Sequence, residues 1–172
     1  KLENNIKDDI LNINKYIGVS KEDLIGIPDD ILNCLPIVDR NPVKYGISIS
    51  NDMYNICMSY IDLPKIRKKL DYFFNTRCLD NTGRFMELFY YRNVLASMLG
   101  FSNYTDLRTN NQVANNHNVI KKFLSDLLMK TDSRYMKELD MLLKLKKQYC
   151  ELNNLHYDDK INTWDLQYYI IK

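Results

Sequence analysis

Chain-breaking residues are scarce in this sequence, and their scarcity limits the folds open to it. Five glycines and four prolines are spread over 172 residues. Because these residues end helices and form most tight turns, a chain with so few of them is expected to form long helices joined by short loops. Apolar residues at three- and four-residue spacing support this expectation. The expected helices are residues 2–17, 29–34, 62–74, 84–99, 115–128, 133–152 and 164–171, with one further turn at 104–108. Helical spacing also begins at Asn51, with apolar residues at Met53, Tyr54, Cys57 and Met58.

The helix expected from residue 62 has the clearest start signal in the chain. Asp62 can act as its N-cap, and Pro64 is tolerated in a first helical turn. The helix over residues 84–99 has the clearest end, because Gly100 follows its last apolar residue.

Residues 43–49 carry the only convincing strand pattern. Val43, Tyr45, Ile47 and Ile49 alternate with polar or small residues, and a period of two is typical of a strand. We therefore expect a mainly α-helical segment with one short extended element. Lead-in helices would occupy residues 1–40, the extended element residues 41–50, and a helical body residues 51–172.

Charge and composition exclude several functions. The formal net charge is +2, from 24 basic and 22 acidic residues, and the signs are interspersed. The short basic runs at 65–69 and 144–147, which include Arg67 and Lys146, are interpreted as solvated helix faces. Neither a basic excess nor a nucleic-acid-reading motif is present to indicate nucleic-acid binding.

No apolar run is long enough to span a membrane, and no signal peptide is recognisable. Four widely spaced cysteines favour free thiols and a cytoplasmic protein. Lys1 is not an initiator Met, so we expect the chain to begin inside a longer protein.

The residue types that build catalytic or metal sites are sparse. His117 and His156 are the only histidines, whereas a zincin site needs two His one helical turn apart, a Glu beside the first, and a third ligand. Both are interpreted as surface or loop residues. Cys150 is close to His156 in the chain, but its place on an apolar stripe favours a buried inert thiol over a nucleophile. We therefore assign no catalytic, cofactor-binding or metal-ligating residue to this chain.

An aromatic cluster near the end of the chain has two interpretations. Trp164, Tyr168 and Tyr169 lie within six residues, and such a cluster favours core or interface packing. The alternative is part of a peptide-binding channel wall. Packing predicts that Trp164 is largely buried, with Tyr168 one turn further along the same helix face.

Several short motifs occur in an order that covers nearly the whole chain. Residues 23–28 resemble E-L-x-G-L-P with Asp23 in place of Glu, residues 64–67 resemble P-x-x-R, and residues 74–78 resemble F-N-x-R-C. Residues 87–101 resemble E-L-x-x-L-R followed by L-G-F/Y, residues 120–124 resemble V-x-x-F-L, and residues 161–169 end in W-D-x-x-Y-Y. The ordered set resembles the thimet oligopeptidase and neurolysin family of zinc metallopeptidases, the M3 peptidases. Tyr91, Thr105 and Val113 depart from the family pattern and are interpreted as packing changes.

The resemblance implies a function for a longer protein. In that family the zinc ligands and general base lie on an H-E-F-G-H helix and a later Glu, toward the C-terminus of the matched segments. The catalytic zinc domain, and the Zn²⁺ cofactor, would therefore lie outside this chain. The chain would be scaffold and channel wall of a zinc metalloendopeptidase that hydrolyses short unstructured peptides, and its partners would be those peptides and the remainder of the peptidase. Two alternatives are a freestanding helical interaction module and a segment of a degenerate inactive family member.

Two arginines lie in or beside apolar stripes at positions that the family pattern holds as Arg. Arg77 follows Phe73 and Phe74, and Arg92 lies one turn after Leu88. A guanidinium there needs acceptors, so at least one is expected to be buried against an acid such as Glu87 or Glu138, or against backbone carbonyls. The alternative is that both reach solvent.

Overall fold

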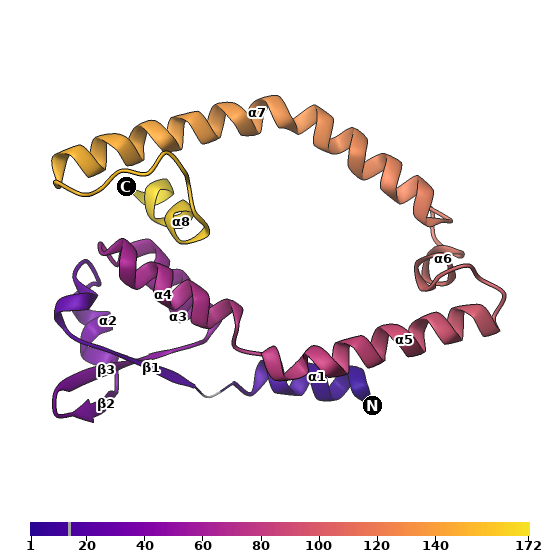
Figure 1. Cartoon of the computed structure of the whole chain (residues 1–172), viewed down its shortest axis with the longest axis horizontal. Coiled ribbons are helices and arrows are strands. Elements are labelled where there is room, and N and C mark those ends of the chain that lie inside the picture. The colour runs from indigo at the N-terminus through magenta and orange to yellow at the C-terminus, as the bar shows by residue number, and fades with distance from the viewer. Residues whose placement is uncertain (14) are drawn as a thin grey trace. The chain divides into compact units, whose positions relative to one another are not determined.

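The computed structural model describes residues 1–13 and 15–172 and is largely helical, with a small sheet (Figure 1). It divides into two compact units. Unit 1 comprises Lys1–Asp9 and Leu79–Glu138, and unit 2 comprises Ile10–Cys78 and Leu139–Lys172. The mainly helical prediction is confirmed. No helix among the described residues is both long enough and apolar enough to cross a membrane.

The sheet of unit 2 has three antiparallel strands in the order β1-β3-β2. The predicted strand is β3 (Val43–Ser48); β1 (Tyr16–Val19) and β2 (Ile37–Arg40) were not predicted. The expectation that the first helix continues to Ile17 is wrong, since α1 ends at Leu11. Ile17 and Val19 instead point into the core from β1. All four residues of β2 are exposed, which explains why it shows no alternation.

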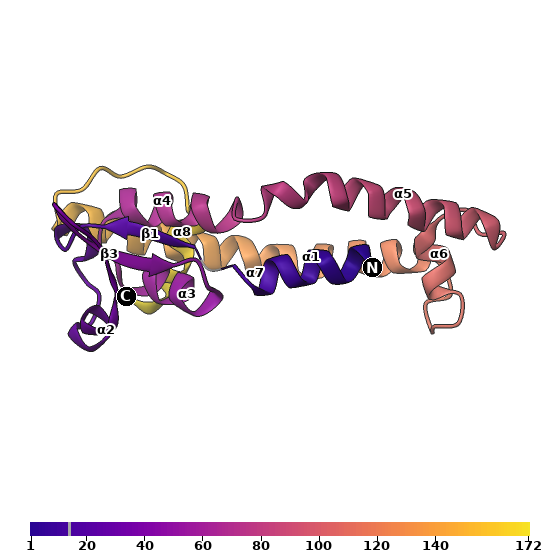
Figure 2. The ribbon, with the colours of Figure 1, turned by 90° about the horizontal axis from the view of Figure 1, so that it is seen from below.

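The helices of unit 2 pack around one apolar core. After the short η1 (Glu22–Leu24) and α2 (Asp29–Cys34), α3 (Asn51–Tyr60) and α4 (Pro64–Asn75) pack together, and α8 (Thr163–Ile171) packs on both (Figure 2). Pro64 occupies the first turn of α4 as predicted, but Leu63, not Asp62, is at the N-cap. The buried apolar side chains are Ile17, Val19, Leu24, Ile27, Leu35, Ile47, Cys57, Met58, Ile61, Ile66 and Leu70.

Gly26 shows why one of the short motifs contains glycine. Its φ is +97°, and a Cβ there would lie 2.1 Å from the carbonyl oxygen of Tyr60. Only glycine adopts this backbone without strain and admits the neighbouring chain so closely. The approach is fixed by the Asp62 amide, which donates to the Ile25 carbonyl at 2.9 Å.

Unit 1 is built on α5 (Thr82–Met98), which follows the short η2 (Leu79–Asn81) and ends before Gly100, whose φ is +80°. Arg92 and Arg84 of α5 form ion pairs with Glu3 and Asp9 of α1 (Leu2–Leu11). The short α6 (Tyr104–Thr109) then leads to the longest helix.

That helix, α7, is continuous over His117–Leu152. The prediction of two helices, separated near Thr131–Ser133, is wrong. These polar residues resemble a helix start, yet the Thr131 hydroxyl donates back to the Leu127 and Leu128 carbonyls at 3.0 and 3.1 Å. A hydroxyl satisfied within its own helix does not interrupt it, and no glycine or proline lies between His117 and Leu152.

Candidate functional site

The most densely bonded group of charges lies in unit 2, where α8 meets α4. Arg67 is fully buried, with 0% of its surface exposed. Its Nε donates to the Trp164 carbonyl at 2.9 Å, and its Nη1 to the Ile61 and Asp62 carbonyls at 2.7 and 3.0 Å. Its Nη2 forms an ion pair with Asp165 at 3.1 Å. The interpretation of this basic run as a solvated face is therefore wrong for Arg67.

Asp165 is shared between Arg67 and a second buried cation. Lys146 of α7, 4% exposed, donates to Asp165 at 2.8 Å and to the Lys160 carbonyl at 2.7 Å, and it also pairs with Asp158. Burial opposes ionisation of Asp165, but hydrogen bonds from Lys146, Asn162 and Arg67 outweigh it and hold the pKa of Asp165 below its usual value. The second basic run is therefore not wholly solvated either.

Asp165 also starts α8. Asn162 is the N-cap, and the Asp165 carboxylate accepts from its backbone amide at 3.3 Å and from its side-chain amide at 3.0 Å, while the Asp165 amide donates to the Asn162 carbonyl at 2.9 Å. One carboxylate thus fixes the helix start and joins it to α4 and α7. The W-D pair of the terminal motif has a structural explanation: the Trp164 carbonyl and the Asp165 carboxylate both bind Arg67.

Tyr168 of the same motif packs against the Arg67 guanidinium and bonds to two further side chains. Tyr168 is fully buried, and the Arg67 guanidinium carbon lies 3.9 Å from its ring centre. Its hydroxyl donates to Asp62 at 2.7 Å and lies 2.6 Å from the Tyr149 hydroxyl. Burial and these two partners raise the pKa of Tyr168. Trp164 is partly buried against the core, less than predicted, while Tyr168 one turn later is buried as expected.

This cluster can hold the helices together, because its charges are paired across α4, α7 and α8. Each charged head is already bonded to protein partners, and a buried charge is tolerated only when it is paired in this way. Tyr168 is held neutral by its raised pKa. The arrangement therefore fits a structural role better than a site of chemistry. The group formed by Arg67, Lys146, Asp165 and Tyr168 is called the clasp below.

The two arginines singled out in the sequence both find protein acceptors. Arg77 is half-buried, donates to the Phe74 carbonyl at a helix end, and lies 3.7 Å from the Phe74 ring centre. Arg92 is half-buried and pairs with Glu3. The expected backbone-carbonyl acceptor is confirmed for Arg77, but the expected burial is wrong, because both arginines are only half-buried. The suggested acids are wrong, because Glu138 binds Arg134 instead and Glu87 is exposed.

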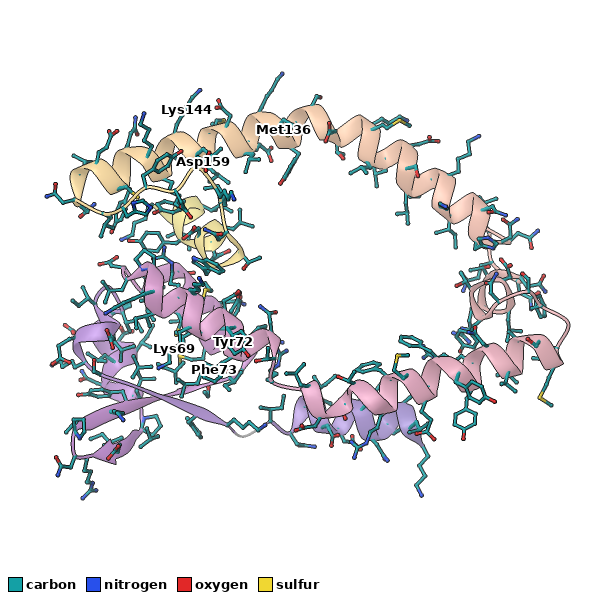
Figure 3. The ribbon with its side chains drawn as sticks, in the orientation of Figure 1. Lys69, Tyr72, Phe73, Met136, Lys144 and Asp159 are labelled. Atoms are coloured by element: carbon teal, nitrogen blue, oxygen red, sulfur yellow. The ribbon has the colours of Figure 1, made fainter. Side chains whose placement is uncertain are left out.

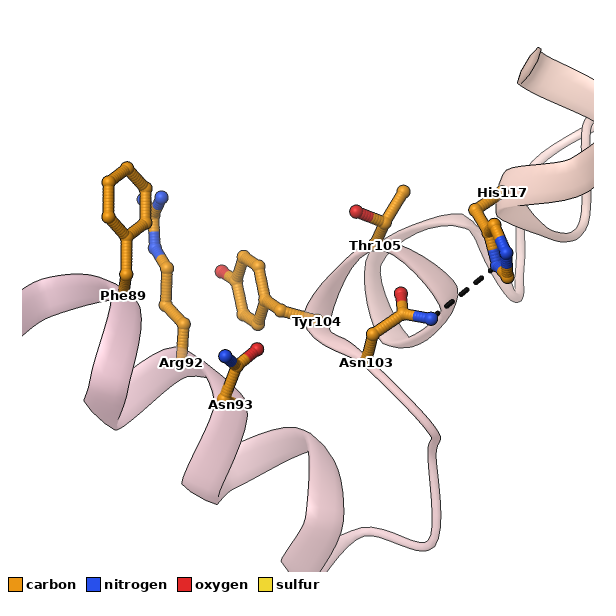
Figure 4. A pocket seen from close by; sticks show the side chains of 7 residues that line it. All are labelled: Phe89, Arg92, Asn93, Asn103, Tyr104, Thr105 and His117. Atoms are coloured by element: carbon orange, nitrogen blue, oxygen red, sulfur yellow. Dashed lines mark hydrogen bonds between the residues drawn. The ribbon is translucent and has the colours of Figure 1, made fainter.

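A pocket of about 500 Å³ lies beside Arg92 in unit 1 (Figure 4). The Arg92 guanidinium carbon is 5.0 Å from the centre of the Tyr104 ring. Its Nε is buried and has no hydrogen-bond partner among the described residues. The pocket is lined by Phe89, Arg92, Asn93, Asn103, Tyr104, Thr105 and His117.

His117 at one end of this pocket is held by Asp106. The Asp106 carboxylate accepts from the backbone amide and the Nδ1 of His117, both at 2.8 Å, and from the Ser102 hydroxyl at 2.8 Å. The amide hydrogen bond first, and then the other donors, hold the pKa of Asp106 well below its usual value. In the described part of the chain, the hydrogen-bond partners of the His117 ring are the Asp106 carboxylate and the Asn103 side chain.

The remaining candidates are not brought together for catalysis. Cys150 is buried, and its Sγ lies 3.7 Å from the backbone carbonyl of His156, not from the imidazole. Residues 1–13 and 15–172 hold no group of three or more His, Cys, Asp or Glu side chains that could bind a metal ion.

Known proteins with similar sequences include oligopeptidases, the class of protein that the short motifs resemble. Saccharolysin of Saccharomyces cerevisiae is 26% identical over 90% of this chain and 22% of its own length, and a thimet-like oligopeptidase of Dictyostelium discoideum is 26% identical over 98% and 25%. Oligopeptidase A of Salmonella typhimurium is 25% identical over 96% and 25%. The chain thus spans about a quarter of the length of these relatives. The family model for peptidase family M3 matches residues 57–172, and the chain belongs to that family.

Proposed function

We propose that this chain is a non-catalytic helical part of a longer zinc metalloendopeptidase that hydrolyses short peptides, and that it forms scaffold and channel wall. The observation that carries the proposal is the match of peptidase family M3 to residues 57–172, in a chain whose described residues bring no metal ligands together. The zinc ligands would lie outside residues 1–172.

The clasp around Arg67 supports a scaffolding role. It joins α4, α7 and α8 through two buried ion pairs, Arg67 with Asp165 and Lys146 with Asp165. Ionic groups buried in this way are lost only at a high energetic cost, so the helices are held in one arrangement.

The histidines allow a direct test of the non-catalytic role. His117 and His156 are the only histidines of this chain, and His is the commonest zinc ligand. We expect the double variant His117→Gln, His156→Gln of the parent peptidase to keep its zinc content and its rate of hydrolysis of a quenched fluorescent peptide. A folded double variant that has lost zinc or activity would show that this chain contributes to the metal site.

The choice of substrate tests the channel. The parent should cleave a short peptide but not the same sequence placed inside a folded domain. Equal rates on both would contradict a wall that excludes folded proteins.

A further inference from the structure

The pocket beside Arg92 lies within a single compact unit. Its lining residues fall between positions 89 and 117, and unit 1 holds all of them. Arg92 and Asn93 line it from α5, and Tyr104 and Thr105 line it from α6, so two neighbouring helices form its walls (Figure 4). Its volume of about 500 Å³ is within the range of about 300–1,000 Å³ that is typical of small-molecule sites.

Hydrogen-bond donors dominate the polar part of this lining. The guanidinium of Arg92 is always charged. The Asn93 amide and the Tyr104 and Thr105 hydroxyls can each donate as well. None of the described residues that line the pocket is Asp or Glu. A wall with a cation, several donors and no carboxylate favours an anionic ligand.

Arg92 can bind a second carboxylate although it already binds one. Its Nη2 donates to Glu3 of α1. A guanidinium carries five N–H donors in a planar fork, so this single bond leaves others for a ligand. The Arg92 side chain is 31% exposed, and its guanidinium carbon is 5.0 Å from the Tyr104 ring centre. The charged head therefore lies over the ring and is partly open to the pocket.

The two acids that bind lining residues are themselves paired. Glu3 binds Arg92, and Asp106 accepts from the His117 Nδ1 and from the Asn103 side-chain amide, both at 2.8 Å. His117 and Asn103 are thus held by Asp106. The donors left for a ligand are those of Arg92 and of the three neutral side chains named above.

Aromatic rings beside these donors narrow the choice of anion. Phe89 and Tyr104 both line the pocket, and aromatic rings pack well against apolar side chains. An inorganic anion would use only the donors. A carboxylate attached to an apolar side chain would use both parts of the lining, and the C-terminal residue of a peptide combines these two groups.

We propose that this pocket binds the free C-terminal carboxylate of a short peptide. Arg92 and the Tyr104 hydroxyl are its donors, Asn93 lies beside them, and Phe89 packs against the side chain of the last residue. The inference rests on the proposed function for the class of ligand, since a peptidase meets short peptides. It adds the place where one end of such a peptide is held.

Equilibrium binding of a peptide acid and of its amide tests the inference. The probes are Gly-Gly-Phe with a fluorophore on its N-terminus, once as the free acid and once as the C-terminal amide. Fluorescence anisotropy gives their affinities for the parent peptidase, treated with a chelator so that neither probe is cleaved. We expect the acid to bind about tenfold more tightly than the amide, because only the acid forms charge-assisted hydrogen bonds.

Two substitutions locate this preference in the pocket. Asn93→Asp replaces an amide by a carboxylate of the same shape, whose repulsion should weaken binding of the acid about tenfold. Tyr104→Phe keeps the ring and removes the hydroxyl, which should weaken binding of the acid about fivefold. Neither should change binding of the amide. The matched control is Gln112→Glu, the same change of amide to carboxylate at an exposed position of unit 1 outside the lining, and it should leave both affinities unchanged.

Three results would overturn the inference. The first is equal affinity for the acid and the amide in the unmodified peptidase. The second is a preference for the acid that survives both substitutions, which a pocket filled by another part of the polypeptide would also give. The third is a loss of binding in Gln112→Glu as large as that in Asn93→Asp, because it would show an unspecific effect of charge.

The folded state of each variant is checked by circular dichroism, and either pocket variant decides without the other. A parent that prefers the acid and loses this preference in the variants, but hydrolyses no peptide, would refute the proposed function and leave this inference standing. A parent that hydrolyses peptides but has no preference for the acid would refute this inference alone.

Discussion

Replacing Arg67 by Met tests the clasp most severely. Met has a similar volume and no charge, so the substitution removes the donors to the carbonyls of Ile61, Asp62 and Trp164, and one of the two cations bound to Asp165. Breaking a fully buried ion pair by removing one partner costs about 3–5 kcal/mol. Because a domain of this kind has a total stability of about 5–15 kcal/mol, the loss should be obvious in unfolding curves.

The assay is urea unfolding followed by the fluorescence of Trp164, the only tryptophan of the chain, whose carbonyl is itself an acceptor of Arg67. The matched control is Lys69→Met, at an exposed position two residues along the same helix (Figure 3). We expect it to change the free energy of unfolding by less than about 0.5 kcal/mol.

The variant Arg67→Lys separates charge from geometry. Lysine keeps the positive charge but has no planar fork to donate to acceptors in several directions, so we expect a cost close to that of Arg67→Met. If Arg67→Met costs no more than Lys69→Met, the network contributes nothing and the reasoning is wrong. If Arg67→Lys matches the unmodified chain, charge alone suffices.

Three further predictions concern single side chains. Trp164→Ala should destabilise by about 2 kcal/mol, below the 3–5 kcal/mol typical of a fully buried large aromatic, because Trp164 is only partly buried; since this variant lacks the fluorescent reporter, its unfolding and that of Lys69→Met are compared by circular dichroism, and a change in urea midpoint no larger than that of Lys69→Met would contradict the prediction. Because the pKa of Asp106 is depressed, its ionised form stabilises the fold fully above the ordinary value of 3.8 and loses this effect as the pH falls through the lower folded-state value. The stability gap between the unmodified chain and Asp106→Asn should therefore be constant near neutral pH and close in strong acid, and a gap that already closes at mildly acidic pH would refute it. Burial raises the pKa of Cys57 to about 12, so a thiol reagent at neutral pH should label the exposed Cys34 and reach Cys57 only after denaturation; equal labelling rates would show that Cys57 is accessible.

Local sequence signals were sufficient for most helices but not for the strands. Pro64 marks the first turn of α4 and Gly100 follows the end of α5, because backbone restrictions act within a few residues. β1 was missed because its four residues, with alternating burial, come only a few positions after an apolar helical pattern. β2 is exposed throughout and is specified by pairing with β3, which no local pattern reveals.

The buried charges could not be predicted from their own surroundings. Arg67 and Lys146 each lie in a run of basic residues, and such runs usually face water. Both are buried because they share Asp165, which lies 98 and 19 residues away from them in the chain. The only sequence signals of the Arg67–Asp165 ion pair were the P-x-x-R and W-D pieces of the family pattern. Each piece contains one of the two residues, and neither shows that the two side chains are in contact.

The acids suggested as partners of Arg77 or Arg92, Glu87 and Glu138, were wrong for a similar reason. Glu87 is near Arg92 in sequence, but Glu3, 89 residues away, forms the ion pair. The position of α1 against α5 decides the partner, and that position depends on tertiary packing.

We propose that this chain supplies framework and not chemistry to a zinc peptidase. The most direct measurement is the zinc content and peptide hydrolysis of the purified chain beside those of the parent peptidase. We expect no stoichiometric zinc and no hydrolysis from the chain alone, and one active zinc site in the parent that a chelator abolishes. Micromolar zinc affinity of the isolated chain, with the absorption spectrum of a four-ligand Cys/His site after cobalt substitution, would contradict the account.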